Sequence, residues 1–155
     1  YCRTNRVLSG YSKDKQIFSD QFFSIKCDVI IPAAKELVIT KKNANNIDCK
    51  VILEAANGPI EFDAEKILIR NNITIIPDIL ANSGGVIVSY YEWLQNKRCE
   101  YWKELDVLKK LSDKMRITYH KMLDTSKEFN TTQRNACYII ALKRLESKIE
   151  RRSLF

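Results

Sequence analysis

Two turns in the sequence carry an asparagine close to glycine, a combination that suits ligand binding. They are Asn57-Gly58-Pro59 and the stretch 82–85, which reads Asn-Ser-Gly-Gly. A side-chain amide both donates and accepts hydrogen bonds, and glycine lets the backbone approach a ligand closely. Each turn also has an ordinary explanation, because Asn-Gly-Pro forms tight turns and Asn-Ser caps helices. The occurrence of two such turns at equivalent places favours a binding site.

Val86 and Ser89 follow the second turn and are candidates for contact with a substrate. They are three residues apart, so they share a face of the helix expected there. The first turn of a helix favours anions, which makes a ligand that bears a carboxylate compatible with the Ser89 hydroxyl. The alternative is a buried serine that hydrogen bonds to its own helix.

Three short apolar runs are expected to form the strands that position these residues. They are Cys27–Ala33, Lys50–Ala56 and Ile73–Asp78. All three are rich in Val and Ile without strict alternation, which is typical of parallel strands buried on both faces. Ligands bind beyond the carboxyl ends of such strands. The prediction therefore places Ala33, Ala34 and both asparagine turns at one edge of the sheet.

Helices are expected between the strands. Thr40 is predicted to cap a short helix that ends at Asn46, and Asp63 is predicted to cap a helix over Ala64–Arg70. Strands that alternate with helices imply right-handed crossovers. The order therefore predicts an α/β fold with a doubly wound parallel sheet.

Three further helices are expected after the strands, over Gly84–Gln95, Trp102–Met122 and Asn130–Glu150, with a loop over Thr125–Asn130. Apolar residues recur at every third or fourth position of the last two helices, and we expect these stripes to face the core. The stripes are Leu105, Leu108, Leu111, Met115, Tyr119 and Met122 in one helix, and Tyr138, Leu142, Leu145 and Ile149 in the other.

Length and composition favour one globular domain. The chain has 155 residues, of which 45% are hydrophobic, and no apolar run is long enough to span a membrane. The net charge of +7 suggests either nucleic-acid binding or a solvated basic surface. The basic residues are dispersed, so we expect no nucleic-acid partner and no membrane partner. No signal peptide is visible, although the chain starts at Tyr1 rather than Met.

The cysteines argue against a metal site. There is no CxxC pair and His120 is the single histidine, so we expect no bound metal and a His120 side chain on the surface. Free thiols indicate a reducing compartment, cytoplasmic or mitochondrial. The five cysteines are Cys2, Cys27, Cys49, Cys99 and Cys137.

Several segments, taken in order, resemble the glutamate dehydrogenase family, which includes enzymes for Glu, Leu, Phe and Val. They are CDVIIPAA, ITKKNA, EAANGP and IPDILANSGGVIVSYYEWLQN, in which Ala81–Trp93 is the most specific part. Arg6–Tyr11 (RVLSGY) and Arg134–Tyr138 (RNACY) also resemble segments of that family. The resemblance implies a partial Rossmann-like sheet from the C-terminal part of the nucleotide-binding domain. It assigns 1–96 to that domain and 97–155 to C-terminal helices that pack on it.

The resemblance implies oxidative deamination of L-glutamate to 2-oxoglutarate and ammonia, with NAD or NADP as hydride acceptor. It also implies a homohexamer at full length. For the cofactor, it assigns Asn57 to the nicotinamide ribose, Asn82 to the carboxamide, and the backbone of Ala33 and Ala34 to the cleft wall. For the substrate, it assigns Ser89 to the carboxylate and Val86 to the side chain.

The sequence departs from the family in two ways. The catalytic Lys and Asp lie in a preceding domain that has no counterpart here, and no GxGxxG turn is present. We therefore expect no catalytic residue in this chain and no activity of the fragment alone. The alternative is an inactive, truncated or degenerate relative with a binding or structural role. The choice between NAD and NADP, the exact amino acid and any allosteric control stay open.

Overall fold

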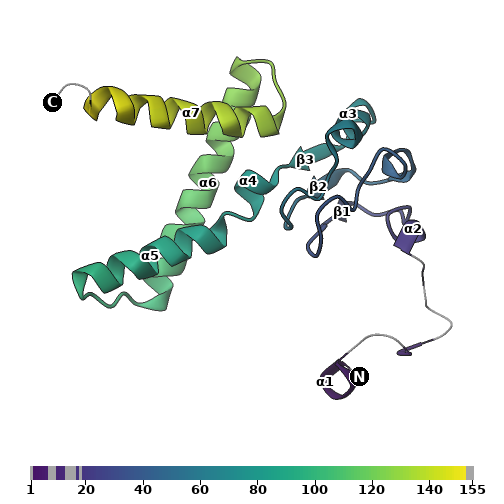
Figure 1. Cartoon of the computed structure of the whole chain (residues 1–155), viewed down its shortest axis with the longest axis horizontal. Coiled ribbons are helices and arrows are strands. Elements are labelled where there is room, and N and C mark those ends of the chain that lie inside the picture. The colour runs from purple at the N-terminus through teal and green to yellow at the C-terminus, as the bar shows by residue number, and fades with distance from the viewer. Residues whose placement is uncertain (1, 7–9, 13–16, 18, 153–155) are drawn as a thin grey trace.

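The computed structural model describes residues 2–6, 10–12, 17 and 19–152. A small parallel sheet is followed by long helices (Figure 1). Two short helices, α1 (Cys2–Asn5) and α2 (Ser19–Phe22), precede the sheet. The segment Arg6–Tyr11 lies partly outside the described residues. The predicted class, an α/β fold with a parallel sheet and C-terminal helices, is confirmed.

The sheet contains the strands β1 (Val29–Ile30), β2 (Val51–Leu53) and β3 (Thr74–Ile76), in that order. Both neighbouring pairs are parallel. Each strand falls within one of the predicted apolar runs but is shorter than the run. The prediction that the strands are buried on both faces is wrong. Ile30 and Ile52 are buried on one face, whereas Val29, which points to the opposite face, is 49% exposed.

The connections between the strands cover the buried face. They contain a short 3-10 helix, η2 (Ala44–Asn46), and helix α3 (Phe62–Arg70), which contact each other. Ala64 and Leu68 are four residues apart on α3 and are fully buried in the core of the sheet. Both connections lie on one face, as right-handed crossovers between strands in sequential order require.

Neither predicted helix cap is used. The short helix is a 3-10 turn that follows Asn43, whose Oδ1 accepts the Thr40 N–H at 2.8 Å. Helix α3 begins at Phe62, one residue earlier than the predicted cap at Asp63. Asp63 instead lies in the first turn and binds Lys66 at 3.0 Å, and this hydrogen bond lowers the pKa of the Asp63 carboxyl. A carboxylate there also suits the positive end of the helix dipole.

Four helices form the second half of the chain: α4 (Asp78–Ala81), α5 (Gly84–Arg98), α6 (Glu104–Glu128) and α7 (Gln133–Arg152). Figure 1 shows α5, α6 and α7 extending away from the sheet, with α4 between the two regions. A second core forms where α4, α6 and α7 meet, and it contains Leu80, Met122 and Ala136. The predicted loop at Thr125–Asn130 is wrong, because Thr125 is buried in this contact and α6 continues to Glu128.

The predicted core stripes of the long helices are only partly buried. On α7, the buried residues are Ala136, Cys137 and Ile140. The four residues of the predicted α7 stripe are all more than half exposed: Tyr138, Leu142, Leu145 and Ile149. On α6, Met122 is fully buried, but Leu105 is 78% exposed. The predicted stripes are wrong in this respect because α6 and α7 cross near one end and contact each other only there (Figure 1).

Three further expectations concern the surface and the thiols. Among the described residues, no helix is long and apolar enough to cross a membrane. The same part of the chain contains no group of three His, Cys, Asp or Glu side chains that could hold a metal ion. Cys27, Cys49, Cys99 and Cys137 are free thiols, and His120 is exposed as predicted.

Candidate functional site

A cleft of about 1060 Å³ lies at the carboxyl end of the sheet. Its walls come from the segments after β1 and β2 and from the first turns of α5. All six predicted site residues line this cleft: Ala33, Ala34, Asn57, Asn82, Val86 and Ser89. A volume of this size suits a sizeable organic ligand. The structure thus brings together residues from three separate segments, as their positions after the strands require.

The two predicted asparagines contact each other. Nδ2 of Asn82 donates to Oδ1 of Asn57 at 2.6 Å and to the carbonyl oxygen of Ala55 at 3.4 Å. Asn57 is exposed and Asn82 half-buried, so both amides are accessible from the cleft. Each amide has two donor hydrogens and two acceptor lone pairs. One shared hydrogen bond therefore fixes their orientation and leaves capacity for a ligand.

The ordinary explanation for the second turn does not hold. Ser83 precedes α5, but no side-chain hydrogen bond caps this helix. The Ser83 hydroxyl donates instead to the carbonyl oxygen of Leu80 at 2.7 Å. Ser89 is exposed to the cleft, which excludes the alternative of a buried serine. Val86, one helical turn earlier, is 74% exposed on the same wall.

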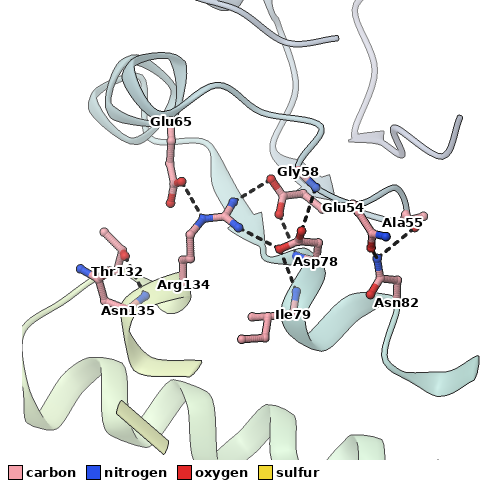
Figure 2. Close-up of polar contacts among 11 residues, drawn as sticks. Glu54, Ala55, Gly58, Glu65, Asp78, Ile79, Asn82, Thr132, Arg134 and Asn135 are labelled. Carbon is pink, nitrogen blue, oxygen red and sulfur yellow. Dashed lines mark hydrogen bonds and ion pairs between the residues drawn. The ribbon is translucent and has the colours of Figure 1, made fainter. Parts of the chain in front are cut away.

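The first turn is held by a carboxylate. Gly58 has a positive φ of 52°, a conformation that glycine adopts at little cost. Its N–H donates to Oδ2 of Asp78 at 2.8 Å. The N–H of Asp78 in turn donates to Oε2 of the fully buried Glu54 at 2.7 Å. The end of β2, the Asn57 turn and the start of α4 are therefore one hydrogen-bonded unit (Figure 2).

Arg134 lies behind this unit and binds three carboxylates (Figure 2). Nη2 contacts Oε1 of Glu54 at 2.7 Å, Nε contacts Oε2 of Glu65 at 2.7 Å, and Nη1 contacts Oδ1 of Asp78 at 2.9 Å. Burial alone would lower the pKa of the guanidinium, but the bonds and charges of Glu54 and Glu65 outweigh it and raise that pKa. Burial raises the pKa of Glu54, and its bond to Arg134 offsets part of this effect. The guanidinium thus balances charges that the interior would otherwise reject.

Sequence reasoning missed the network of Glu54, Asp78 and Arg134. One signal was available, because Glu54 is a charged residue inside the apolar run Lys50–Ala56 and a buried charge needs a partner. Its partner could not be located, since Arg134 is 80 positions away in sequence. Lys35 and Glu36 were also missed, although they follow Ala34 directly and line the cleft.

Comparisons with known proteins identify the family of the chain. The sequence model of the Glutamate/Leucine/Phenylalanine/Valine dehydrogenase family matches residues 2–153. The NAD-specific glutamate dehydrogenase of Peptoniphilus asaccharolyticus is 38% identical over 155 residues, all of this chain and 37% of that protein. The enzyme of the same name from Staphylococcus aureus (strain COL) is 39% identical over 131 residues, 84% of this chain and 32% of that protein. The chain therefore spans about a third of the length of these relatives.

Solved structures show the same relationship. The crystal structure of the Peptoniphilus asaccharolyticus enzyme matches with a TM-score of 0.77 at 41% identity, covering 81% of this chain and 32% of that one. Plasmodium falciparum glutamate dehydrogenase 2 matches with a TM-score of 0.74 at 34% identity, over 83% and 30% of the two chains. The hetero-hexameric Thermus thermophilus enzyme has a TM-score of 0.87 over 94% and 34%, but at 20% identity it supports the fold alone. The chain belongs to the Glutamate/Leucine/Phenylalanine/Valine dehydrogenase family.

Proposed function

We propose that this chain forms part of the cofactor and substrate cleft of an NAD- or NADP-dependent glutamate dehydrogenase. The reaction converts L-glutamate, water and the oxidised cofactor to 2-oxoglutarate, ammonium, the reduced cofactor and a proton. One observation carries the proposal: the six residues assigned by family resemblance, from three separate segments, line a single cleft. The curated relatives named NAD-specific glutamate dehydrogenase support this reading of the cleft.

In this proposal, the asparagine pair receives the nicotinamide end of the cofactor. Asn57 binds the ribose and Asn82 binds the carboxamide, while the backbone at Ala33 and Ala34 forms the opposite wall. The hydrogen bond of 2.6 Å between the two amides holds both in one orientation before the cofactor arrives. When bound, the cofactor supplies the hydride acceptor. The chain's own contribution is to position it, which lowers the entropic part of the barrier.

The substrate contacts come from α5. The Ser89 hydroxyl donates to the carboxylate of glutamate, and Val86 packs against the substrate side chain. Val86 lies in the first turn of α5 and Ser89 in the second, close to the helix N-terminus where the dipole favours a negative charge. The proposal therefore places the amino acid next to the nicotinamide, on the wall that carries Asn82.

The remaining parts of the reaction are assigned to regions that this chain does not span. We propose that a phosphate-binding turn and the catalytic Lys and Asp belong to the rest of a longer protein. Residues 1–96 would complete its nucleotide-binding domain, residues 97–155 would pack on that domain, and the full-length protein would be a homohexamer. The free thiols of the described residues favour a reducing compartment, cytoplasmic or mitochondrial.

The first test is the intact mass of the natural protein, followed by an assay of its longest form. We expect a mass well above 18.1 kDa, the mass of these 155 residues. We also expect glutamate-dependent reduction of NAD or NADP, followed by the absorbance of the reduced nicotinamide. Leucine, valine and phenylalanine are tested as competing substrates, since all belong to the family's range. A mass near 18.1 kDa without turnover would support the alternative, an inactive relative with a binding or structural role.

A further inference from the structure

Arg134 is a single cation that joins three elements of the fold. Its three guanidinium nitrogens contact Glu54 after β2, Glu65 on α3 and Asp78 at the start of α4, at 2.7 to 2.9 Å. The side chain of Arg134 is 19% exposed and that of Glu54 is fully buried. Charge-assisted bonds of this length in a protected site are strong and directional. Arg134 therefore fixes the relative positions of these three carboxylates.

Asp78 extends this network to the cleft. Oδ1 of Asp78 faces Arg134 at 2.9 Å, and Oδ2 accepts the N–H of Gly58 at 2.8 Å. Gly58 directly follows Asn57, whose Oδ1 accepts from Asn82 at 2.6 Å. Two hydrogen bonds, from Arg134 to Asp78 and from Gly58 to Asp78, and the covalent link between Gly58 and Asn57 thus connect the Arg134 side chain to the asparagine pair.

The Gly58 turn is held by several restraints: the carbonyl oxygen of Gly58 accepts the N–H of Leu37 at 2.9 Å, Pro59 is fully buried, and the Gly58 N–H bonds to Asp78. Gly58 is exposed, has a φ of 52°, and no atom lies within 4 Å of where a Cβ would be. Among these restraints, the bond to Asp78 is the one that holds the Gly58 N–H. Without Arg134, two carboxylates on Glu54 and Asp78 would face each other without a counter-charge, which is unfavourable. Asp78 has 21% of its side chain exposed and could rotate toward water, which would release the Gly58 N–H.

The start of α7 sets the position of Arg134. Oγ1 of Thr132 accepts the N–H of Asn135 at 3.2 Å, in the manner of a helix N-cap. Arg134 therefore lies in the first turn of α7, at a point fixed by the cap. We propose that Arg134 is a positioning residue for cofactor binding: through Asp78 it holds the Asn57–Gly58 turn in the geometry that receives the nicotinamide ribose. This inference rests on the proposed function and adds a residue outside the cleft that stabilises the cofactor site.

The binding test separates the two ends of the cofactor. The longest natural form of the protein is titrated separately with the full cofactor, NAD or NADP, and with ADP or its 2′-phosphate. The ADP compounds lack the nicotinamide and its ribose. Arg134→Lys keeps one charge but cannot form the three-way fork. We expect about tenfold weaker binding of the full cofactor, the size of one or two lost hydrogen bonds, and less than about a twofold change for the ADP compound. Equal losses for both ligands, or none for either, would overturn the proposal.

Two further measurements keep the proposal testable. Amide hydrogen exchange at Gly58 without ligand should become about tenfold faster in Arg134→Lys, since a lost hydrogen bond exposes that N–H; unchanged protection would overturn the proposal. If Arg134→Lys does not fold, Asp78→Asn removes the charge with little change in size and should give the same pattern. Arg116→Lys, which changes an exposed ion pair on α6, is the matched control and should change neither readout.

The outcomes also distinguish this inference from the proposed function. Failure of the wild-type protein to bind either nicotinamide cofactor would refute the proposed function. The exchange rate of Gly58 would then still show whether Arg134 holds the turn. Normal cofactor binding by wild type together with an unchanged ratio of full cofactor to ADP compound in Arg134→Lys would refute the positioning role alone.

Discussion

The α/β region, residues 27–77, and the helical region, residues 78–152, bury their apolar residues in different ways. The core of the α/β region contains ten buried residues drawn from short strands, η2, α3 and the loops around them. The core of the other region contains five, although its helices are much longer. Helix α5 has no buried residue at all in the described structure. The region with the longer helices therefore has the smaller buried core.

This difference shows which interactions stabilise each region. In the α/β region, strands of two or three residues exist because Ile52 and its neighbours are buried together, which is tertiary stabilisation. In the helical region, periodicity and local hydrogen bonds define long helices. Helices α5 and α6 contact each other, but the buried apolar core forms where α4, α6 and α7 meet. The Arg134 network lies at the junction of the two regions. The predictions below test this contrast.

The largest effect is expected at the junction. Arg134→Met should lower the free energy of unfolding by about 3–5 kcal/mol, because it leaves partly and fully buried carboxylates without a counter-charge. Arg116→Met, the control, breaks an exposed pair with Asp113 and should cost less than about 1 kcal/mol. Urea unfolding followed by circular dichroism measures both. Similar costs for the two variants would contradict the role of the junction.

The same residue type can be compared across the two regions. Leu68→Ala removes a fully buried side chain from the α/β core and should cost about 2–5 kcal/mol. Leu142→Ala removes a side chain that is 63% exposed on α7 and should cost less than about 0.5 kcal/mol in the 155-residue chain. The unfolding midpoints in urea provide the measurement. A large cost at Leu142 would show that this face of α7 is covered in the form measured.

The cleft takes residues from both regions, and its two halves should respond separately. In the full-length enzyme, Ser89→Ala should weaken glutamate binding by about tenfold, the size of a hydrogen bond to a charged group, with less effect on the cofactor. Asn82→Ala should mainly disturb the nicotinamide end and slow hydride transfer. Separate titrations with glutamate and cofactor measure these effects. Ser112→Ala, at an exposed position of α6, is the control; equal effects of Ser89→Ala on both ligands would contradict the assignment.

The smallest effect is expected from pH. Burial raises the pKa of the Cys137 thiol to about 11 from an ordinary value of 9.0. Because the folded pKa is raised, the stability that this thiol contributes is fully present below pH 9 and is lost as pH rises through 11. The loss is about 0.8 kcal/mol at pH 9.5. Unfolding of wild type and Cys137→Ala between pH 8 and about pH 10 tests this sign; a steeper decline in the variant would contradict it.

Much of the fold could be predicted because its signals are local. Runs of Val and Ile located the three strands, periodic apolar residues located α6 and α7, and the Asn82-Ser83 turn located the start of α5. The caps at Thr40 and Asp63 and the loop at Thr125–Asn130 were wrong, because tertiary contacts decided where those helices begin and end. Helix α4 has four residues and no periodic pattern, so it was not anticipated. Burial of the helix stripes also depends on which surfaces meet, and no local pattern encodes that.

Some residues of the candidate site could also be predicted from the sequence, whereas others could not. Asn57, Asn82 and Ser89 follow strand ends or begin a helix, so their convergence could be predicted from topology and from family resemblance. The Arg134 network could not, because its contacts join residues 56 to 80 positions apart. A buried glutamate in an apolar run indicates that a cation lies next to it in the fold, but it does not show which residue supplies that cation. The residue that supports the cleft was therefore less visible than the residues that line it.

The long separation between Arg134 and its partners has a consequence for biosynthesis. On the ribosome, Glu54, Glu65 and Asp78 emerge well before Arg134, which lies in the last helix. Until that helix docks, the three carboxylates have no cation, and burying Glu54 in its charged form is unfavourable. We therefore expect this edge of the sheet to reach its full stability only after α7 has been synthesised. Docking of α7 is then the step that supplies the cation for these three carboxylates.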